Sequence, residues 1–197
     1  IIFSSSREMH LKHVNDALTL LGKAGLSLKF NKCHFFQEAV DYLGNVIRPG
    51  KLAAAEKNTA ALRNAPLPKT QTELRSFLGL CSVYRRFVPL SAAVAAPLIS
   101  LLGKGTPPQL GTISAQQIDA FNTLREKLIS PPVLALPRTT GKLWLDTAAS
   151  DGQLGTCLLQ EQPDGQILLL GYWSRTLNPA ERNYSTTEKE FLAIVVL

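Results

Sequence analysis

The sequence lacks the features that mark secreted, membrane-spanning or disulfide-stabilised chains. Its three cysteines, Cys33, Cys81 and Cys157, are odd in number, far apart and without a C-x-x-C spacing, so a disulfide framework and a zinc site are disfavoured. No apolar run approaches the roughly 20 residues that a membrane helix needs. The start IIFSSSREMH has neither the basic region nor the cleavage site of a signal peptide. We therefore expect an intracellular chain that is not secreted and has no membrane partner.

Acidic residues are scarce in the first half of the chain. Residues 1–110 hold 14 Lys and Arg against 6 Asp and Glu, whereas residues 111–197 hold 7 against 9. The net charges of +8 and −2 agree with the +6 of the whole chain. A basic half predicts a polyanionic partner, although a solubilising surface would give the same excess of charge.

The composition, with 45% hydrophobic and 18% charged residues, is that of an ordinary globular protein. The chain opens within one apolar run, residues 1–3, and stops within another, residues 191–197. Natural termini are usually polar. We therefore expect this chain of 197 residues to be an internal fragment of a longer polypeptide.

Capping signals and apolar periodicity predict helices and two strands in the first part of the chain. Two Ser/Thr-x-x-Glu spacings are typical of helix starts, alternation of apolar and polar residues is typical of strands, and Ala-rich stretches between prolines favour further helices. The expected elements are helices that start at Ser5 and Thr70, strands over 26–36 and 39–47, and helices over 53–64 and 89–102.

The helix that starts at Thr70 combines a basic face with an apolar one. Arg75, Arg85 and Arg86 lie on the basic face, and the run Tyr-Arg-Arg-Phe ends the segment. This mixture suits packing on one side and contact with phosphates on the other, so these three arginines are candidate nucleic-acid-binding residues. The apolar face consists of Leu74, Phe77, Leu78, Cys81 and Tyr84.

The second part of the chain predicts a helix followed by a small antiparallel sheet, so the fold class is α+β. Capping-box spacings at Ser114 and Ser185, the latter with Glu188 as its partner, start two helices. Between them lie an extended connector and three alternating segments, with a tight turn at residues 163–165. The expected elements are a helix with Ile118, Phe121, Leu124 and Leu128 buried, a connector over 133–137, strands over 142–147, 154–160 and 166–174, and a last helix.

A carboxylate at the end of the first of these strands is how a metal-dependent nuclease site often begins. Here Asp146 and Asp151 flank four uncharged residues, with nothing acidic between them. Asp151 is better explained as a loop or turn residue. The strand therefore offers one carboxylate, Asp146, where such a site would need several.

Four segments, in this order and spacing, resemble the polyprotein of gypsy-type LTR retrotransposons: DYLGNVI, ELRSFLGLCSVYRRFVPLS, AFNTLREKLISPPVLALP and YWSRTLNPAERNYSTTEKEFLAIV. The resemblance covers essentially the whole chain. It implies that residues 1–55 end a reverse-transcriptase palm, 56–105 form the thumb, 106–140 a connector, and 141–197 the opening of a truncated ribonuclease H domain. It also implies an RNA/DNA hybrid or primer–template duplex and the rest of the polyprotein as partners, in the cytoplasm, a virus-like particle or the nucleus.

The parent polyprotein of this family makes DNA on an RNA template and cleaves the RNA of hybrids, with Mg²⁺ as cofactor. The resemblance places the polymerase Tyr-x-Asp-Asp box just before Ile1, so the carboxylates that would hold two metal ions are absent from this chain. It matches Tyr42, Leu43 and Gly44 to the hairpin that positions the primer end. The residues alone favour plain strand packing for these three.

The ribonuclease H portion departs from the pattern that it resembles. The family's first carboxylate lies in Thr-Asp-Ala-Ser, and alignment through Thr147 and Asp151 puts Ala148 in the Asp position; the next carboxylate, a Glu on the first helix, matches Glu190. Asp146 lies two residues away, a displacement of roughly 6–7 Å, which the short oxygen distances of Mg²⁺ do not tolerate. We expect a catalytically inactive fragment that binds no Mg²⁺ productively. The alternative is a non-catalytic nucleic-acid-binding remnant or coopted module.

Overall fold

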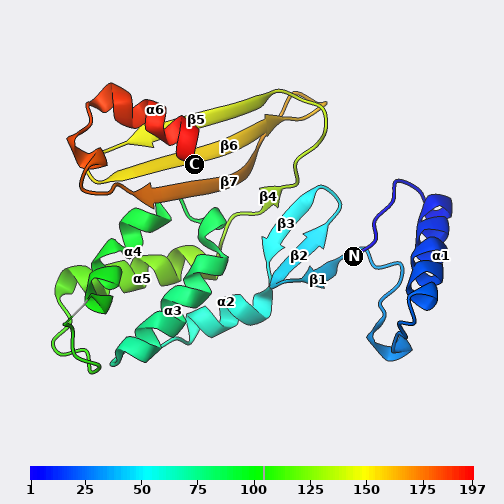
Figure 1. The fold of residues 1–197 in the computed structure, drawn as a ribbon, viewed down its shortest axis with the longest axis horizontal. Helices are drawn as coiled ribbons and strands as arrows, with labels where there is room; N and C mark the ends of the chain where they lie inside the picture. The colour runs from blue at the N-terminus through cyan, green and yellow to red at the C-terminus, as the bar shows by residue number, and fades with distance from the viewer. Residues whose placement is uncertain (104) are drawn as a thin grey trace. The chain divides into compact units, whose positions relative to one another are not determined.

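A computed structural model, which describes residues 1–103 and 105–197, divides the chain into two units, Ile1–Glu38 and Ala39–Leu197. Residue 104, within the segment expected as the thumb over 56–105, lies outside the described residues. The elements, labelled as in Figure 1, are α1 Arg7–Lys23, η1 Phe30–Lys32, β1 Val40–Tyr42, β2 Asn45–Arg48, β3 Lys51–Ala54, α2 Glu56–Arg63, α3 Gln71–Val83, η2 Arg85–Phe87, α4 Ser91–Ile99, η3 Ser100–Leu102, α5 Ala115–Ile129, β4 Leu134–Ala135, β5 Leu143–Ala149, β6 Gln153–Glu161, β7 Ile167–Thr176, η4 Glu181–Asn183 and α6 Thr186–Val196.

The first unit is built around α1, and its N-cap differs from the prediction. The Ser6 hydroxyl accepts a hydrogen bond from the Met9 N–H at 3.2 Å, whereas Ser5 contacts the Met9 sulfur instead. The expectation that Ser5 caps this helix is therefore wrong by one residue, because two adjacent serines offer the same side chain. None of the α1 residues is buried.

The strand expected over 26–36 is wrong. The segment holds only the short helix η1, closed by backbone hydrogen bonds from Lys32 to Lys29 and from Cys33 to Phe30. Its alternating apolar residues, such as Leu26 and Phe30, are exposed. Alternation forms a strand only where a neighbouring strand and a core are present, and within the described residues this segment has neither.

The strand expected over 39–47 is interrupted by a turn. β1 and β2 pair antiparallel, with Tyr42 opposite Asn45, so residues 43 and 44 form the two-residue connection. A second turn at Pro49-Gly50 leads into β3, whose far edge pairs with β4. The Leu-Gly pair was the missed signal, because glycine permits the positive φ that tight hairpins require. The helix expected from residue 53 begins at Glu56, since β3 occupies residues 51–54.

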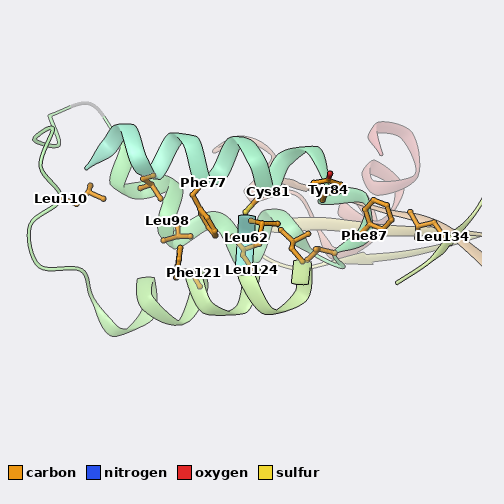
Figure 2. Close-up of a cluster of buried hydrophobic side chains, with 14 of the residues drawn as sticks. Leu62, Phe77, Cys81, Tyr84, Phe87, Leu98, Leu110, Phe121, Leu124 and Leu134 are labelled. Carbon is orange, nitrogen blue, oxygen red and sulfur yellow. The ribbon is translucent and has the colours of Figure 1, made fainter. Parts of the chain in front are cut away.

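The main hydrophobic core lies among α2, α3, α4 and α5, as Figure 2 shows. The rings of Phe77 on α3 and Phe121 on α5 meet at 4.5 Å between centroids. Thr70 caps α3 and Ser114 forms a full capping box with Gln117, as predicted. Ile118 is exposed rather than buried, because α5 turns only the other three predicted residues inward.

The second sheet, β5-β6-β7, is antiparallel throughout, as predicted, with α6 packed against β5 and β6 (Figure 1). A smaller core of Leu154, Leu177 and Ala193 joins α6 to the sheet. Ser185 and Glu188 form the expected capping box at the start of α6. None of the helices in the described part of the chain has the length and apolarity that crossing a bilayer requires.

Candidate nucleic-acid interface and carboxylate site

The β1–β2 turn presents two exposed side chains on a strained backbone. Leu43 and Gly44 have φ values of +48° and +82°, the combination that a type I′ hairpin turn requires. A leucine rarely adopts this conformation, which costs roughly 1–2 kcal/mol. Leu43 is 75% exposed and Tyr42 is 46% exposed, so burial within the chain does not compensate for the strain.

A buried tyrosine anchors this turn to the helical region. The Tyr84 hydroxyl donates to the Gly44 carbonyl, and the Asn58 amide donates to the same hydroxyl. Tyr84 is 1% exposed, and the Ala55 N–H also donates to the Gly44 carbonyl at 3.0 Å. A Cβ at Gly44 would come within 2.9 Å of the Tyr84 oxygen. Glycine is therefore needed at this position both for its backbone conformation and for space.

Two of the candidate arginines follow Tyr84 directly. Arg85 and Arg86 belong to η2, and both are exposed. Among the described residues, neither makes a salt bridge. Tyr84 thus connects the β1–β2 turn with two cations that are available for a phosphate backbone.

Arg75 is not brought into this group. It lies in the second turn of α3, ten residues before Arg85, which is about 15 Å along a helix axis. Its guanidinium donates to Gln71 at 2.7 Å, and Gln71 in turn donates to the carbonyl groups of Thr106 and Pro107. Arg75 is therefore held beside the loop after η3, at the other end of α3.

Glu190 projects from α6 toward β5, at the position that the alignment left incomplete. Its carboxylate accepts hydrogen bonds from the Thr147 hydroxyl at 3.2 Å and from the Ala149 N–H at 3.3 Å. These two residues flank Ala148, and the Ala149 N–H lies on the edge of β5 that no other described strand pairs. The structure therefore brings Glu190 to the two neighbours of Ala148, whereas the alternation of side chains along β5 directs the Ala148 methyl group to the opposite face of the sheet.

The other nearby carboxylates are directed elsewhere. Asp146 contacts the Cys157 thiol across the strand pair at 3.9 Å, and burial together with this carboxylate raises the pKa of that thiol. Asp151 lies in the loop after β5, as predicted, and pairs with the buried Lys189 ammonium at 3.2 Å. Neither carboxylate shares a ligand sphere with Glu190.

The residues around Glu190 do not fit a magnesium site of the two-metal kind. Such a site needs several converging carboxylates, whereas the described residues contain no group of three His, Cys, Asp or Glu side chains placed to hold a metal ion. Both oxygens of Glu190 already accept hydrogen bonds from β5. The groups at this place are thus one carboxylate and the two hydrogen-bond donors that it accepts from, a hydroxyl and a backbone N–H.

A separate hollow of about 490 Å³ lies between the β2–β3 turn, β4 and the β6–β7 hairpin. Its rim carries Arg48, Lys51 and Arg138, and its floor is apolar. Arg138 also lines a second hollow together with Asp164 of the β6–β7 hairpin. The basic and apolar residues of the larger hollow do not define a ligand.

Sequence reasoning missed the residues that hold the candidate side chains in place. The sequence pattern assigns Tyr84 to apolar packing, gives no role to Asn58 or Lys189, and uses Thr147 only to align the strand. Their partners are 26 to 43 positions away in the sequence, so no local spacing could identify them. The signal available was Tyr84 itself, because a buried tyrosine usually finds a partner for its hydroxyl.

Comparisons with known proteins identify the family of the second part of the chain and relatives of the chain as a whole. Residues 113–197 match the family model described as the RNase H-like domain found in reverse transcriptase. The Retrovirus-related Pol polyprotein from transposon 297 of Drosophila melanogaster is 37% identical over 99% of this chain and 18% of its own length. The Transposon Tf2-3 polyprotein of Schizosaccharomyces pombe is 34% identical over 99% of this chain and 14% of its own length. This chain therefore spans less than a fifth of these relatives.

Solved structures share the fold. A foamy viral protease-reverse transcriptase in complex with an RNA/DNA hybrid superposes with a TM-score of 0.81 at 21% identity, over 98% of this chain and 26% of that one. Another structure of that protein, in complex with double-stranded DNA, has a TM-score of 0.80 at the same identity, over 98% of this chain and 40% of that one. Residues 113–197 therefore belong to the RNase H-like domain family found in reverse transcriptase, within a chain homologous to the Pol polyproteins of LTR retrotransposons, with which the gypsy-type resemblance is consistent.

Proposed function

We propose that this chain grips a nucleic-acid duplex as part of a retrotransposon reverse transcriptase. The observation that carries the proposal is the link made by Tyr84, whose hydroxyl anchors the β1–β2 turn and whose neighbours are Arg85 and Arg86. A turn that exposes Tyr42 and Leu43 beside two free cations offers an apolar contact and a phosphate contact to one duplex. The foamy viral relatives of this fold are complexes with an RNA/DNA hybrid and with double-stranded DNA, which supports a duplex as the ligand.

The domain boundaries expected from the sequence are part of the proposal. Residues 1–55 would end the palm, 56–105 form the thumb, 106–140 the connector and 141–197 the start of the ribonuclease H domain. The order of a β-hairpin, a helical region and an antiparallel sheet supports this division. The family match begins at residue 113, so in this division α5 serves as connector and also as the first element of the matched domain.

The chain does not cleave the hybrid in this proposal. The motivating observation is the single carboxylate, Glu190, whose two oxygens are hydrogen-bonded to Thr147 and Ala149 on β5, with an alanine between these residues. Mg²⁺ belongs to the parent enzyme, and this donor set supplies too few ligands to retain it. Mg²⁺-dependent hydrolysis of an RNA/DNA hybrid by the purified chain, abolished by Glu190→Gln, would contradict this part of the proposal.

The binding proposal is tested with single arginine variants. Arg85→Ala and Arg86→Ala should each weaken binding of a labelled RNA/DNA hybrid about tenfold at low salt, because each removes a charge-assisted hydrogen bond to phosphate. Fluorescence anisotropy measures the dissociation constants. Lys127→Ala, which removes an exposed cation from α5, is the matched control and should change the dissociation constant little. Equal losses for all three variants would show unspecific attraction and would refute the assignment to Arg85 and Arg86.

A further inference from the structure

Helix α4 lacks a cap of its own. Its N-cap residue is Leu90, which adopts a left-handed conformation with φ +51° and offers no side-chain hydrogen bond. Helix N-caps are normally Ser, Thr, Asp or Asn, because their side chains accept from the orphan N–H groups of the first turn. The first turn of α4 therefore depends on an acceptor from elsewhere.

Strand β7 supplies that acceptor. The Ser174 hydroxyl accepts a hydrogen bond from the Ala92 N–H at 2.9 Å, and it lies 3.1 Å from the Ser91 hydroxyl. Ser174 is 82 residues away from Ala92 in the sequence. The start of the helix is thus capped by a distant residue of the same chain, on the sheet of the RNase H-like domain. We call this long-range cap within one chain the trans-cap.

The side chain of Leu90 fits where a glycine leaves room on β6. A Cβ built on Gly155 would lie 2.3 Å from the Leu90 Cδ2 atom and 3.6 Å from its Cγ. Gly155 pairs with Ala148 on β5, and the residue before it, Leu154, packs in the small core with Ala193 of α6. Because successive residues of a strand face opposite sides of the sheet, Leu90 at the start of α4 and helix α6 lie on opposite faces. The strained backbone of Leu90 is therefore associated with a specific packing contact.

A third contact joins the same surfaces just before α4. The Arg86 carbonyl lies 3.6 Å from the position of a Cβ at Gly171 on β7, and η2 packs against that strand. We propose that Gly155 and Ser174 are positioning residues that fix the start of α4, and with it the Arg85–Arg86 pair, on the β5–β7 sheet. This attachment of α4 to the sheet does not depend on nucleic-acid binding. Its role in binding, to hold the arginine pair at a set distance from the Glu190 position, rests on the proposed function.

The trans-cap is tested by amide exchange in the whole chain. Ser174→Ala should speed hydrogen exchange of the Ala92 amide about tenfold, as expected for loss of an N-cap, whereas the Ala93 amide, which donates to the Leu90 carbonyl at 2.9 Å, should change little. Ser174→Thr, which retains the hydroxyl, should restore protection. Ser82→Ala removes a hydroxyl that bonds within α3 and is the matched control. Unchanged exchange at Ala92 in Ser174→Ala would overturn the cap.

The packing contact is tested with a double-mutant cycle. Gly155→Ala should raise the unfolding equilibrium constant about tenfold, because the added methyl group displaces Leu90, and Leu90→Ala should abolish most of that effect. Gly152→Ala, at a glycine with open space around its Cβ position, is the control. Both tryptophans, Trp144 and Trp173, lie on this sheet, so their fluorescence reports the sheet while far-UV dichroism reports mainly the helices.

The wild-type chain and the Gly155→Ala variant should each show coincident transitions by the two signals, because the cycle compares equilibrium constants of two-state unfolding. Additive effects of Gly155→Ala and Leu90→Ala in the cycle would overturn the positioning role. Failure of the arginine variants to weaken hybrid binding would leave the cycle and the exchange results unaffected, so the two proposals fail separately.

Discussion

At the scale of single residues, the chain retains strain at exposed positions. Leu43 and Leu90 both have positive φ values, and neither gains full burial in return, since both count as exposed. Leu90 has a packing partner in Gly155. Leu43 has none among the described residues that would bury it, so a contact outside the chain is the physical reason we assign to it.

Leu43→Asn should therefore raise stability and weaken binding at the same time. Asn-Gly is the preferred sequence of a type I′ turn, and relief of the left-handed strain should stabilise the chain by about 1 kcal/mol. Loss of the exposed leucine should weaken hybrid binding. Urea unfolding and anisotropy measure the two effects. Leu26→Asn, at another exposed leucine whose φ is not positive, should produce neither. A stabilised variant with unchanged affinity for the hybrid would show that Leu43 does not belong to the interface.

At the scale of elements, helix starts were predictable and the anchoring contacts were not. The caps at Thr70, Ser114 and Ser185 were predicted because each bond spans only three residues. The strand expected over 26–36 was wrong because alternation is a local pattern, whereas the sheet and core that turn it into a strand are not. The contact of Tyr84 with Gly44 spans 40 residues, so the anchor of the candidate interface was beyond local reasoning.

The cap of α6 should make stability depend on pH. Hydrogen bonds from the Ser185 N–H, and then from its hydroxyl, lower the pKa of Glu188 below the ordinary value. A carboxyl group with a lowered folded pKa stabilises the fold above its unfolded pKa, and this contribution is lost as the pH falls through the folded pKa.

In Glu188→Gln, the free energy of unfolding should therefore fall less steeply as the pH is lowered from about 6 to about 3, the range in which carboxyl groups titrate. Urea midpoints measured across this range provide the test. Glu126→Gln, at an exposed position of α5 outside its first turn, is the control and should leave the slope as it is in the wild type. A variant at residue 188 with the wild-type slope would show that the capping bonds are not formed in solution.

At the scale of the whole molecule, the first part of the chain is basic and the second part is slightly acidic. The basic excess of +8 lies in residues 1–110, which hold the hairpin and most of the helical region, whereas residues 111–197 carry −2. A duplex carries one negative charge per phosphate and releases counterions when cations bind it. If the chain binds a duplex as proposed, the first part should therefore supply most of the electrostatic attraction, and the RNase H-like part should contribute little.

Hybrid binding should accordingly weaken steeply with salt. The logarithm of the binding constant should fall linearly with the logarithm of the salt concentration, and Arg85→Ala should make the slope shallower by about 0.9, the contribution of one phosphate contact. Anisotropy titrations in increasing KCl measure the slopes. A binding constant that does not change with salt, or a slope that Arg85→Ala leaves unaltered, would argue against phosphate contact at this arginine.

The trans-cap on α4 also sets an order of events during synthesis. The Ala92 N–H has no protein acceptor until Ser174, 82 residues later in the sequence, has been synthesised. At translation rates of about 5–20 residues per second, this takes roughly 4–16 s. During that interval the Leu90 side chain cannot pack against Gly155, and the Ala92 N–H has only water as its acceptor. The helix is therefore completed after β7 has been made, so the last strand of the sheet, rather than the sequence of α4 itself, decides when the helical region reaches its final form.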